Sequence, residues 1–264
     1  MSETNITILV STVDSKILLN KSLLETKLHE KLRMLVINQL IGSDEELVID
    51  LPFITVINSR SRGLSKSRNI GLSNVQKGFG IVADDDVNYV PGFEKIIREA
   101  IAEFRNVSIF TFQIETPEGD TYKEYKQRGF THGWRSILRV SSISTVINIE
   151  SVKSDNIYFD ERFGLGAKFP TGEENIFLND LLRKGYAIRS IPKPMVIHPR
   201  ESSGSQITAD LIFSKGAMFR RLYGYGGVLF IILFVLKKQG LPFSTKGLHA
   251  FKCGVNGFIS YSKA

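Results

Sequence analysis

The sequence predicts an α/β fold in which a mixed, mostly parallel sheet is flanked by helices. Three observations support this class. Short apolar segments of strand length alternate with segments whose apolar residues recur at helical spacing, and polar residues follow several of the strands. The chain has 264 residues, enough to bury a full core, with hydrophobic and charged fractions of 42% and 23% that are ordinary for a globular protein.

The alternation is clearest in the first half of the chain. Short apolar runs predict buried strands at residues 6–10, 34–37, 54–57 and 80–83. Apolar residues at helical spacing predict helices at residues 18–32, 65–75 and 91–104. The last helix is expected to open at Pro91, because the fixed φ of proline suits the first helical turn.

The second half is less regular. Residues 108–114 and 145–149 predict strands, and the polar, glycine-containing residues 115–131 between them predict a loop. A helix is expected from Glu174, with apolar residues on one face and Gly185 as its stop. Two short extended segments are expected after it, at residues 187–191 and 194–197.

The C-terminal part predicts a helical extension, residues 211–264, after a first domain at 1–210. Its run of nine apolar residues, 228–236, is too short for a bilayer-spanning helix, which needs about 20. Basic side chains flank or interrupt the apolar segments: Lys215, Arg220, Arg221, Lys237, Lys238, Lys246 and Lys252. This pattern favours an extension that lies on an anionic membrane surface, and a helix packed on the first domain with a solvated basic face is the alternative.

Charge and cysteine content restrict the partners and the compartment. The formal net charge of +7 favours anionic partners, although no stripe of interleaved basic and aromatic residues indicates nucleic acid. A single cysteine, Cys253, excludes an internal disulfide and fits a reducing compartment. The first residues lack the pattern of a signal peptide, so we expect a cytoplasmic protein, peripheral on the inner face of the membrane if the extension binds there.

Three carboxylates, Asp84, Asp85 and Asp86, follow the apolar strand at 80–83. Such neighbours repel one another, and burial increases the penalty. A divalent cation, Mn²⁺ or Mg²⁺, relieves the repulsion and in turn implies an anionic ligand such as a diphosphate. A solvated acidic turn is the alternative. Ser11 and Thr12 follow the first strand, and the ends of parallel strands meet at one edge of a sheet.

Three further segments complete a pattern. The run Gly-Leu-Ser-Lys-Ser-Arg-Asn occupies residues 63–69, and residues 159–166 and 171–177 read Phe-Asp-Glu-Arg-Phe-Gly-Leu-Gly and Thr-Gly-Glu-Glu-Asn-Ile-Phe. Together with the aspartates, their order and spacing resemble family 2 glycosyltransferases of the GT-A fold, especially bacterial enzymes that build surface polysaccharides. The resemblance covers residues 4–200 and implies a Rossmann-like sheet.

The resemblance implies a site for a nucleoside-diphosphate sugar. Asp84 matches the carboxylate that contacts the ribose, and Asp86 matches the one that holds the metal. Asp85 is expected to share either task and Asp84 to be a second metal ligand, because three adjacent aspartates leave the register open. His198 is expected to complete the metal site, with a purely structural role as the alternative. The other donor-binding candidates are Ser11, Thr12, Asn38, Arg60, Arg68 and Asn69.

These donor candidates have different expected roles. Ser11 and Thr12 would lie beside the nucleoside, and Asn38 would contact the base without charge, where many relatives have an aspartate. Arg68 would pair with phosphate or brace an aspartate. A solvated helix start is the alternative for the arginines, Arg60 and Arg62 included.

Glu173 and Glu174 occupy the place of the family's acidic pair. We expect Glu174 to be the general base that takes the proton of the acceptor hydroxyl, and Glu173 to be its partner. The spacing from Thr171 to Glu174 also fits a capping box, in which Glu174 would only cap its helix. Trp134, the single tryptophan, is expected to stack on a sugar or to belong to the core.

The predicted activity is therefore inverting, metal-dependent transfer of a sugar, most simply from a UDP-sugar, to a hydroxyl of a saccharide acceptor, such as a lipid-linked oligosaccharide. A catalytically silent membrane-surface protein on the same scaffold is one alternative. A sugar nucleotidylyltransferase is another, although the residues after the first strand contain no glycine to cradle a triphosphate.

Overall fold

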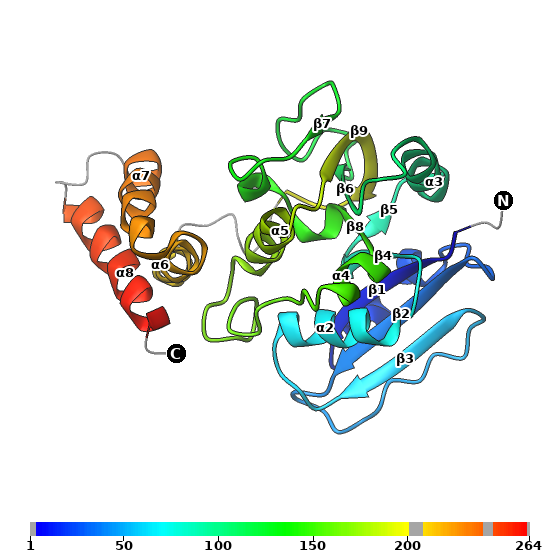
Figure 1. The fold of residues 1–264 in the computed structure, drawn as a ribbon. Helices are drawn as coiled ribbons and strands as arrows, with labels where there is room; N and C mark the ends of the chain where they lie inside the picture. The colour runs from blue at the N-terminus through cyan, green and yellow to red at the C-terminus, as the bar shows by residue number, and fades with distance from the viewer. Residues whose placement is uncertain (1–3, 201–207, 240–244, 263–264) are drawn as a thin grey trace.

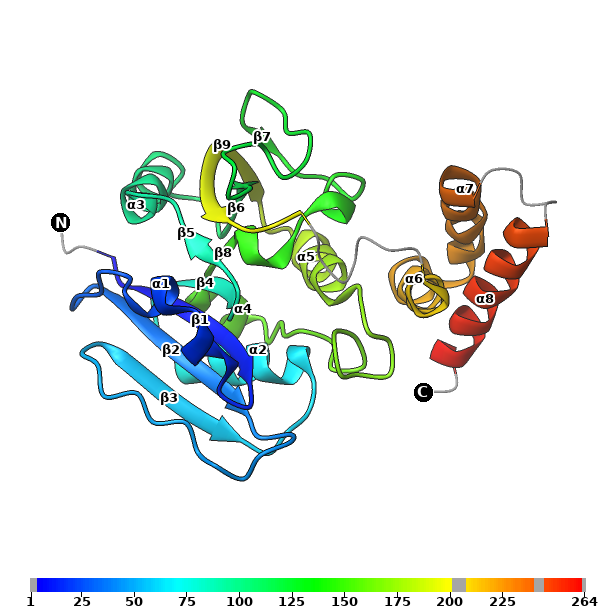
Figure 2. The same cartoon turned by 180° about the vertical axis from the view of Figure 1, so that it is seen from behind.

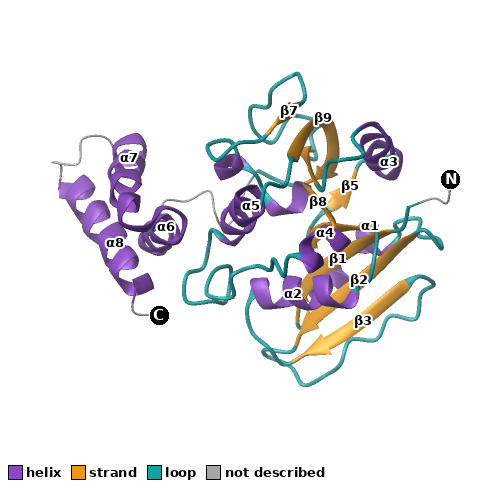
Figure 3. Ribbon diagram, in the orientation of Figure 1, coloured by secondary structure: helices purple, strands orange, loops and turns teal. Residues whose placement is uncertain are grey.

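The computed structural model describes residues 4–200, 208–239 and 245–262, and its strands form one mixed sheet (Figures 1 and 3). In chain order the strands are β1 Ile6–Val13, β2 Leu32–Gln39, β3 Ile54–Ser59, β4 Phe79–Asp84, β5 Asn88–Tyr89, β6 Ile109–Glu115, β7 Phe130–Thr131, β8 Thr145–Asn148 and β9 Ile188–Ile197. The strand order is β3-β2-β1-β4-β8-β6-β9-β5, and β7 pairs with β9.

The first half of the sheet is wholly parallel. β1 lies between β2 and β4, and β3 pairs with β2, all in the same direction. β8 runs antiparallel to β4 and β6, whereas β9 is parallel to β6. The register sets Ser11 opposite Asp84 and Thr12 opposite Asn38. The sheet therefore brings the polar carboxyl ends of β1, β2 and β4 to one edge, as the sequence predicted.

Helices cover both faces of the sheet. Those that precede the C-terminal extension are α1 Lys21–Leu24, α2 Leu64–Asn74, α3 Phe93–Glu103, α4 Ile149–Ser154 and α5 Glu173–Arg183, together with the 3₁₀ turns η1 Lys16–Leu19, η2 Ile137–Arg139 and η3 Ser142–Ser144. β1 shows why two apolar layers form: Ile8 and Val10 point to one face and Leu9 to the other, with all three buried.

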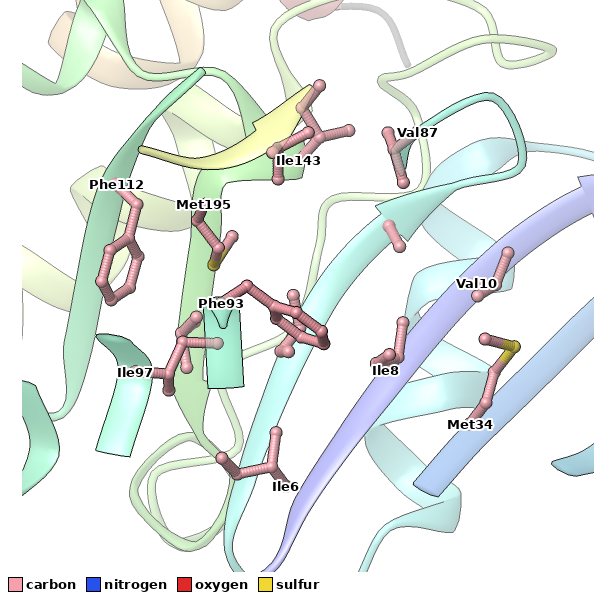
Figure 4. Packing of buried hydrophobic residues seen from close by; sticks show 14 of the residues in the cluster. Ile6, Ile8, Val10, Met34, Val87, Phe93, Ile97, Phe112, Ile143 and Met195 are labelled. Carbon is pink, nitrogen blue, oxygen red and sulfur yellow. The ribbon is translucent and has the colours of Figure 1, made fainter. Parts of the chain in front are cut away.

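The two layers hold separate cores. On one face, β1 and β2 pack with α1 and α3, and Figure 4 shows Phe93, Ile97 and Met195 meeting beside Ile8. On the other face, α2, α4 and α5 cover the sheet, where Phe177 stacks on Phe159 with ring centroids 4.2 Å apart. The expected α/β class, a mixed sheet between helices, is confirmed.

The expected helix at residues 18–32 is wrong. The structure has instead the short η1 and α1, which Asn20 separates. The Asn20 side chain accepts a hydrogen bond from Leu23 N and donates to the carbonyls of Asp85 and Val87. These hydrogen bonds to the turn that follows β4 hold Asn20 as the cap of α1, so η1 and α1 cannot join into one helix.

Other elements differ in their bounds. α3 begins at Phe93 rather than Pro91, because Gly92 stands before it with φ 77°. The segments expected at 187–191 and 194–197 form the single strand β9, and α4 and β5 were not expected. Residues 115–131 are largely loop, apart from the two residues of β7 at their end.

The C-terminal extension folds into α6 Ala209–Tyr223, the turn η4 Gly224–Gly226, α7 Gly227–Gln239 and α8 Thr245–Ser262. These helices pack on one another and form a group beside α5 in both Figures 1 and 2. Their shared core also includes Phe163, Phe169 and Ile176 of the first domain. Arg221 of α6 pairs with Asp180 of α5 at 2.6 Å. The domain boundary at 210/211 stays a prediction.

One stretch of the described helices, Ala209–Lys237, is long and apolar enough to cross a membrane by length and composition. It is not one straight helix, since Gly224, with φ 58°, ends α6 and η4 separates it from α7. Arg220 and Arg221 lie at its centre. These features argue against a single membrane-spanning segment at this place.

Candidate active site

A cleft of about 580 Å³ opens at the carboxyl edge of the sheet, between the strand ends, α5 and the C-terminal extension. Five of the residues predicted from sequence line it together: Arg68, Asp84, Glu173, Glu174 and His198. They come from α2, β4, α5 and the end of β9. The fold thus joins segments more than 100 residues apart into one polar site, at the edge where ligands bind in such sheets.

Arg68 is the centre of the charge network. Its guanidinium is only 3% exposed, and it donates to Glu173 Oε1 at 2.9 Å, to Asp84 Oδ1 at 3.0 Å and to Ser142 Oγ at 2.9 Å. Of the two roles considered for Arg68, phosphate pairing and bracing an aspartate, this arrangement supports the second. Arg68 holds two acidic side chains of different elements in fixed positions.

Asp84 and Asp85 have pKa values above the usual range. Burial raises the pKa of the Asp84 carboxyl, and the charge of Arg68 opposes that rise. Burial also raises the pKa of Asp85, whose carboxylate accepts a hydrogen bond from Thr12 Oγ1. The Thr12 hydroxyl therefore fixes the position of the Asp85 carboxylate. Ser11 Oγ accepts a hydrogen bond from Ser67 Oγ of α2 at 2.8 Å. Both hydroxyls tie β1 to its neighbours at the strand ends.

Asp86 lies opposite His198, with 3.4 Å between Oδ2 and Nε2. His198 Nδ1 is 2.7 Å from the carbonyl oxygen of Pro199, so it donates there and leaves Nε2 toward Asp86. The hydrogen bond with His198 lowers the pKa of Asp86, and the same contact raises the pKa of His198. The predicted grouping of Asp86 and His198 in one site is consistent with this distance.

Glu173 and Glu174 begin α5, whose N-cap is Gly172 with φ 103°. No side chain of the described residues caps this end, so the capping box expected from Thr171 is not formed. Both residues line the cleft, and Glu173 is buried against Arg68. Burial and the neighbouring Glu173 raise the pKa of Glu174 to about 7, and the charge of Lys215 opposes the rise. A carboxylate with such a pKa is suited to take a proton near neutral pH.

Asn38 does not have the environment of a base-binding residue. Its side chain is fully buried, its Oδ1 accepts from Ser15 N, and its amide donates to Asn58 Oδ1 at 2.8 Å. Both polar groups are used within the protein, where they join β2 to the loop after β1 and to β3. This environment contradicts the expectation that Asn38 contacts the base.

Asn69 and Arg60 also lie outside the described lining of the cleft. Asn69 bonds both to the nitrogen and to the oxygen of Phe159, at 2.8 and 3.0 Å, so it fastens α2 to the segment before α5. Arg60 is exposed and pairs with Asp44. Asn69 was expected in the donor site because Arg68 and Asn69 match the family's Arg-Asn pair, and Arg60 was a further candidate. In the structure their side chains bond to Phe159 and Asp44 instead.

Trp134 packs against the extension, and it is not among the described residues that line the cleft. Its ring meets those of Tyr223 and Phe230 edge to face, with centroids 6.2 and 6.0 Å apart, and Arg135 covers it. The expected stacking on a sugar is therefore not supported. Trp134 is a contact between the first domain and the extension.

The extension supplies cleft residues that the sequence did not identify. Leu211, Lys215 and Phe234 of the extension line it, together with Thr208 and Asp210 just before the extension. The signal available in the sequence for Lys215 was only its place in a basic, apolar segment. Ser142, which begins the turn η3 and accepts from Arg68, had no distinguishing signal in the sequence, because serine is common in turns.

Comparisons with solved structures identify similar folds in Staphylococcus aureus TarS. The chain aligns with TarS 1–349 in complex with UDP-GlcNAc at a TM-score of 0.66 and 15% identity, covering 97% of this chain and 81% of that one. The UDP complex gives 0.59 and 14%, with 91% and 73% covered. No known family profile and no curated protein sequence matches. The chain therefore shares the fold of these TarS structures, in which a mostly parallel central sheet is flanked by helices.

Proposed function

We propose that the protein is an inverting glycosyltransferase of family 2 that uses a nucleoside-diphosphate sugar, most simply a UDP-sugar. The observation that carries the proposal is the position of Glu174. This carboxylate, with a pKa of about 7, lines the same cleft as Asp84 and His198. The structural neighbours that hold UDP-GlcNAc and UDP support the nucleotide part of the proposal.

The proposed reaction is one displacement at the anomeric carbon. The acceptor hydroxyl oxygen forms the new glycosidic bond while the bond from the anomeric carbon to the diphosphate oxygen breaks. Glu174 takes the proton of the hydroxyl, and the electron pair leaves with the nucleoside diphosphate. The configuration at the anomeric carbon inverts because the acceptor oxygen attacks on the side opposite to the leaving diphosphate. General base action of this kind contributes roughly 10²–10⁴-fold.

Asp86 and His198 fit a site for Mn²⁺ or Mg²⁺. A carboxylate oxygen and an imidazole nitrogen are suitable ligands for such an ion, and Asp86 Oδ2 and His198 Nε2 face each other at 3.4 Å, so these two residues would hold it. Among the described residues no three His, Cys, Asp or Glu side chains group closely enough to hold an ion, so diphosphate oxygens and water would complete the coordination. When bound, the ion would neutralise charge on the leaving diphosphate.

Asp84 does not fit the metal role as well. One of its oxygens accepts from Arg68, which already compensates its charge. We propose that Asp84 contacts the donor and that Arg68 keeps its carboxylate oriented, with Asp85 held by Thr12 beside it. The contacts of Asp84 with Arg68 and of Asp85 with Thr12 offset part of the repulsion among the three consecutive carboxylates.

The acceptor is proposed to be a saccharide hydroxyl, on a lipid-linked oligosaccharide of the kind used to build bacterial surface polysaccharides. Residues of the extension, including Leu211, Lys215 and Phe234, line the cleft and would form its acceptor side. A mixed wall of apolar and polar groups suits the two faces of a sugar ring. The extension would then take part in choosing the acceptor.

The substitution Glu174→Gln tests the proposal. We expect transfer to fall by at least about 10²-fold, while donor binding measured by calorimetry with Mn²⁺ changes little. Glu103→Gln, an exposed glutamate at the end of α3, is the matched control and should keep wild-type turnover. Full turnover by the Glu174 variant would contradict the base assignment. Failure of the wild type to bind any nucleotide sugar would favour a catalytically silent protein.

A further inference from the structure

The outer face of α7 is apolar and exposed. Leu229, Leu233 and Leu236 are 58%, 51% and 38% exposed, and their spacing of four and three residues puts them on one side of the helix. The opposite side, with Ile231 and Val235, is buried against α6 and α8. A helix that is apolar all round but buried on only one side has a second apolar face that needs a partner.

The charge of the extension indicates which partner. Residues 211–264 contain eight Lys and Arg and no Asp or Glu, so the whole of the protein's positive excess lies here. Lys237 is exposed four residues after Leu233 and continues the same side of α7, and Lys252 is exposed on α8. A second copy of this face would bring like charges together, whereas a surface of anionic lipid complements them.

We propose that the outer face of α7 docks on an anionic lipid surface, with the leucines in the interface and the lysines at the head groups. α7 has 13 residues and is therefore about 20 Å long, short of the roughly 30 Å of a bilayer core, so the helix lies on the membrane and does not cross it. Helices of this composition enter the interface by about 5–10 Å.

The docking face is next to the cleft. Phe234 lines the cleft, and its neighbour Leu233 lies on the exposed side of the same helical turn. Docking by α7 would hold the mouth of the cleft at the lipid surface, where an acceptor carried by a lipid would be found. The docking itself does not depend on the proposed sugar transfer and can be measured without any nucleotide.

The first experiment is sedimentation of the full chain with vesicles. We expect it to sediment with vesicles of equal parts phosphatidylcholine and phosphatidylglycerol, and much less with phosphatidylcholine alone. Leu229→Ser with Leu233→Ser should weaken binding by roughly tenfold or more. The matched control is Val48→Ser with Leu51→Ser, two exposed apolar residues between β2 and β3, which should bind like the wild type.

A second measurement uses the wild-type chain, so that a folding defect cannot imitate loss of docking. Trp134 is the single tryptophan and contacts Phe230 of α7. We expect phosphatidylglycerol vesicles that carry nitroxide-labelled lipid to quench its fluorescence. Equal binding to neutral vesicles, equal loss in the control variant, or absence of quenching would overturn the proposal. A wild-type dimer that the leucine variant dissociates would show that a second copy covers this face.

Discussion

Removal of the Arg68 guanidinium should destabilise the fold strongly. Arg68→Met keeps most of the aliphatic part of the side chain but leaves Glu173 and Asp84 without their common partner, and Arg68 is only 3% exposed. Breaking a buried ion pair such as Arg68–Glu173 costs about 3–5 kcal/mol, because the uncompensated charge of Glu173 stays buried, whereas Asp84 is partly solvated and adds less. We expect a loss of that size in urea unfolding at pH 7.

The pH dependence of this loss follows from Asp84. Its folded-state pKa is already raised, and removal of Arg68 takes away the charge that lowers it. A carboxyl whose pKa is higher in the folded state than in the unfolded state, where it is about 4, destabilises the fold at pH values above about 4. Below that pH the carboxyl is protonated in both states and no longer has this effect. The difference in free energy of unfolding between variant and wild type should therefore become smaller as the pH falls toward about 4.

The control for this experiment is Arg60→Met, which removes an exposed arginine paired with Asp44. Exposed pairs contribute about 0–1 kcal/mol, so this variant should unfold nearly as the wild type does. Adding Glu173→Gln to the Arg68 variant should restore part of the stability, since one of the two orphaned charges is gone. A loss below about 1 kcal/mol for Arg68→Met would refute the reasoning, because it would mean that the carboxylates are solvated.

Three further predictions concern the cleft. Turnover at saturating substrates should rise with pH through about 7, because Glu174 must be deprotonated to act as the base, and a flat profile between pH 6 and 8 would contradict this role. Lys215→Met should shift this rise to higher pH, since the lysine charge lowers the pKa of Glu174, and Lys252→Met on the exposed side of α8 should not. Asp86→Ala should abolish most of the difference in donor affinity with and without Mn²⁺, measured by calorimetry, and an undiminished metal effect would exclude Asp86 as a ligand.

The expected strands of the first half lie where the sequence predicted them. Those in the middle of the sheet, β1, β2 and β4, are buried as their apolar runs require, whereas β3 at the edge is only partly buried. The helix expected at residues 18–32, by contrast, was wrong. Its leucines have helical spacing, yet Leu19 is 86% exposed and Asn20 is fixed by the carbonyls of the acidic turn. A tertiary hydrogen bond decided the local structure there, and no periodicity in the sequence reports it.

The fold class and the acidic candidates could be predicted from sequence, because three carboxylates after a strand, Asp84–Asp86, and two at the start of a helix, Glu173–Glu174, are electrostatically costly patterns. The pairing of these groups could not be predicted. Arg68 reaches a carboxylate 105 residues away, and Asn38 and Trp134 turn out to be occupied by protein contacts. The physical reason is that hydrogen-bond partners are set by packing in three dimensions, whereas the sequence records only order along the chain.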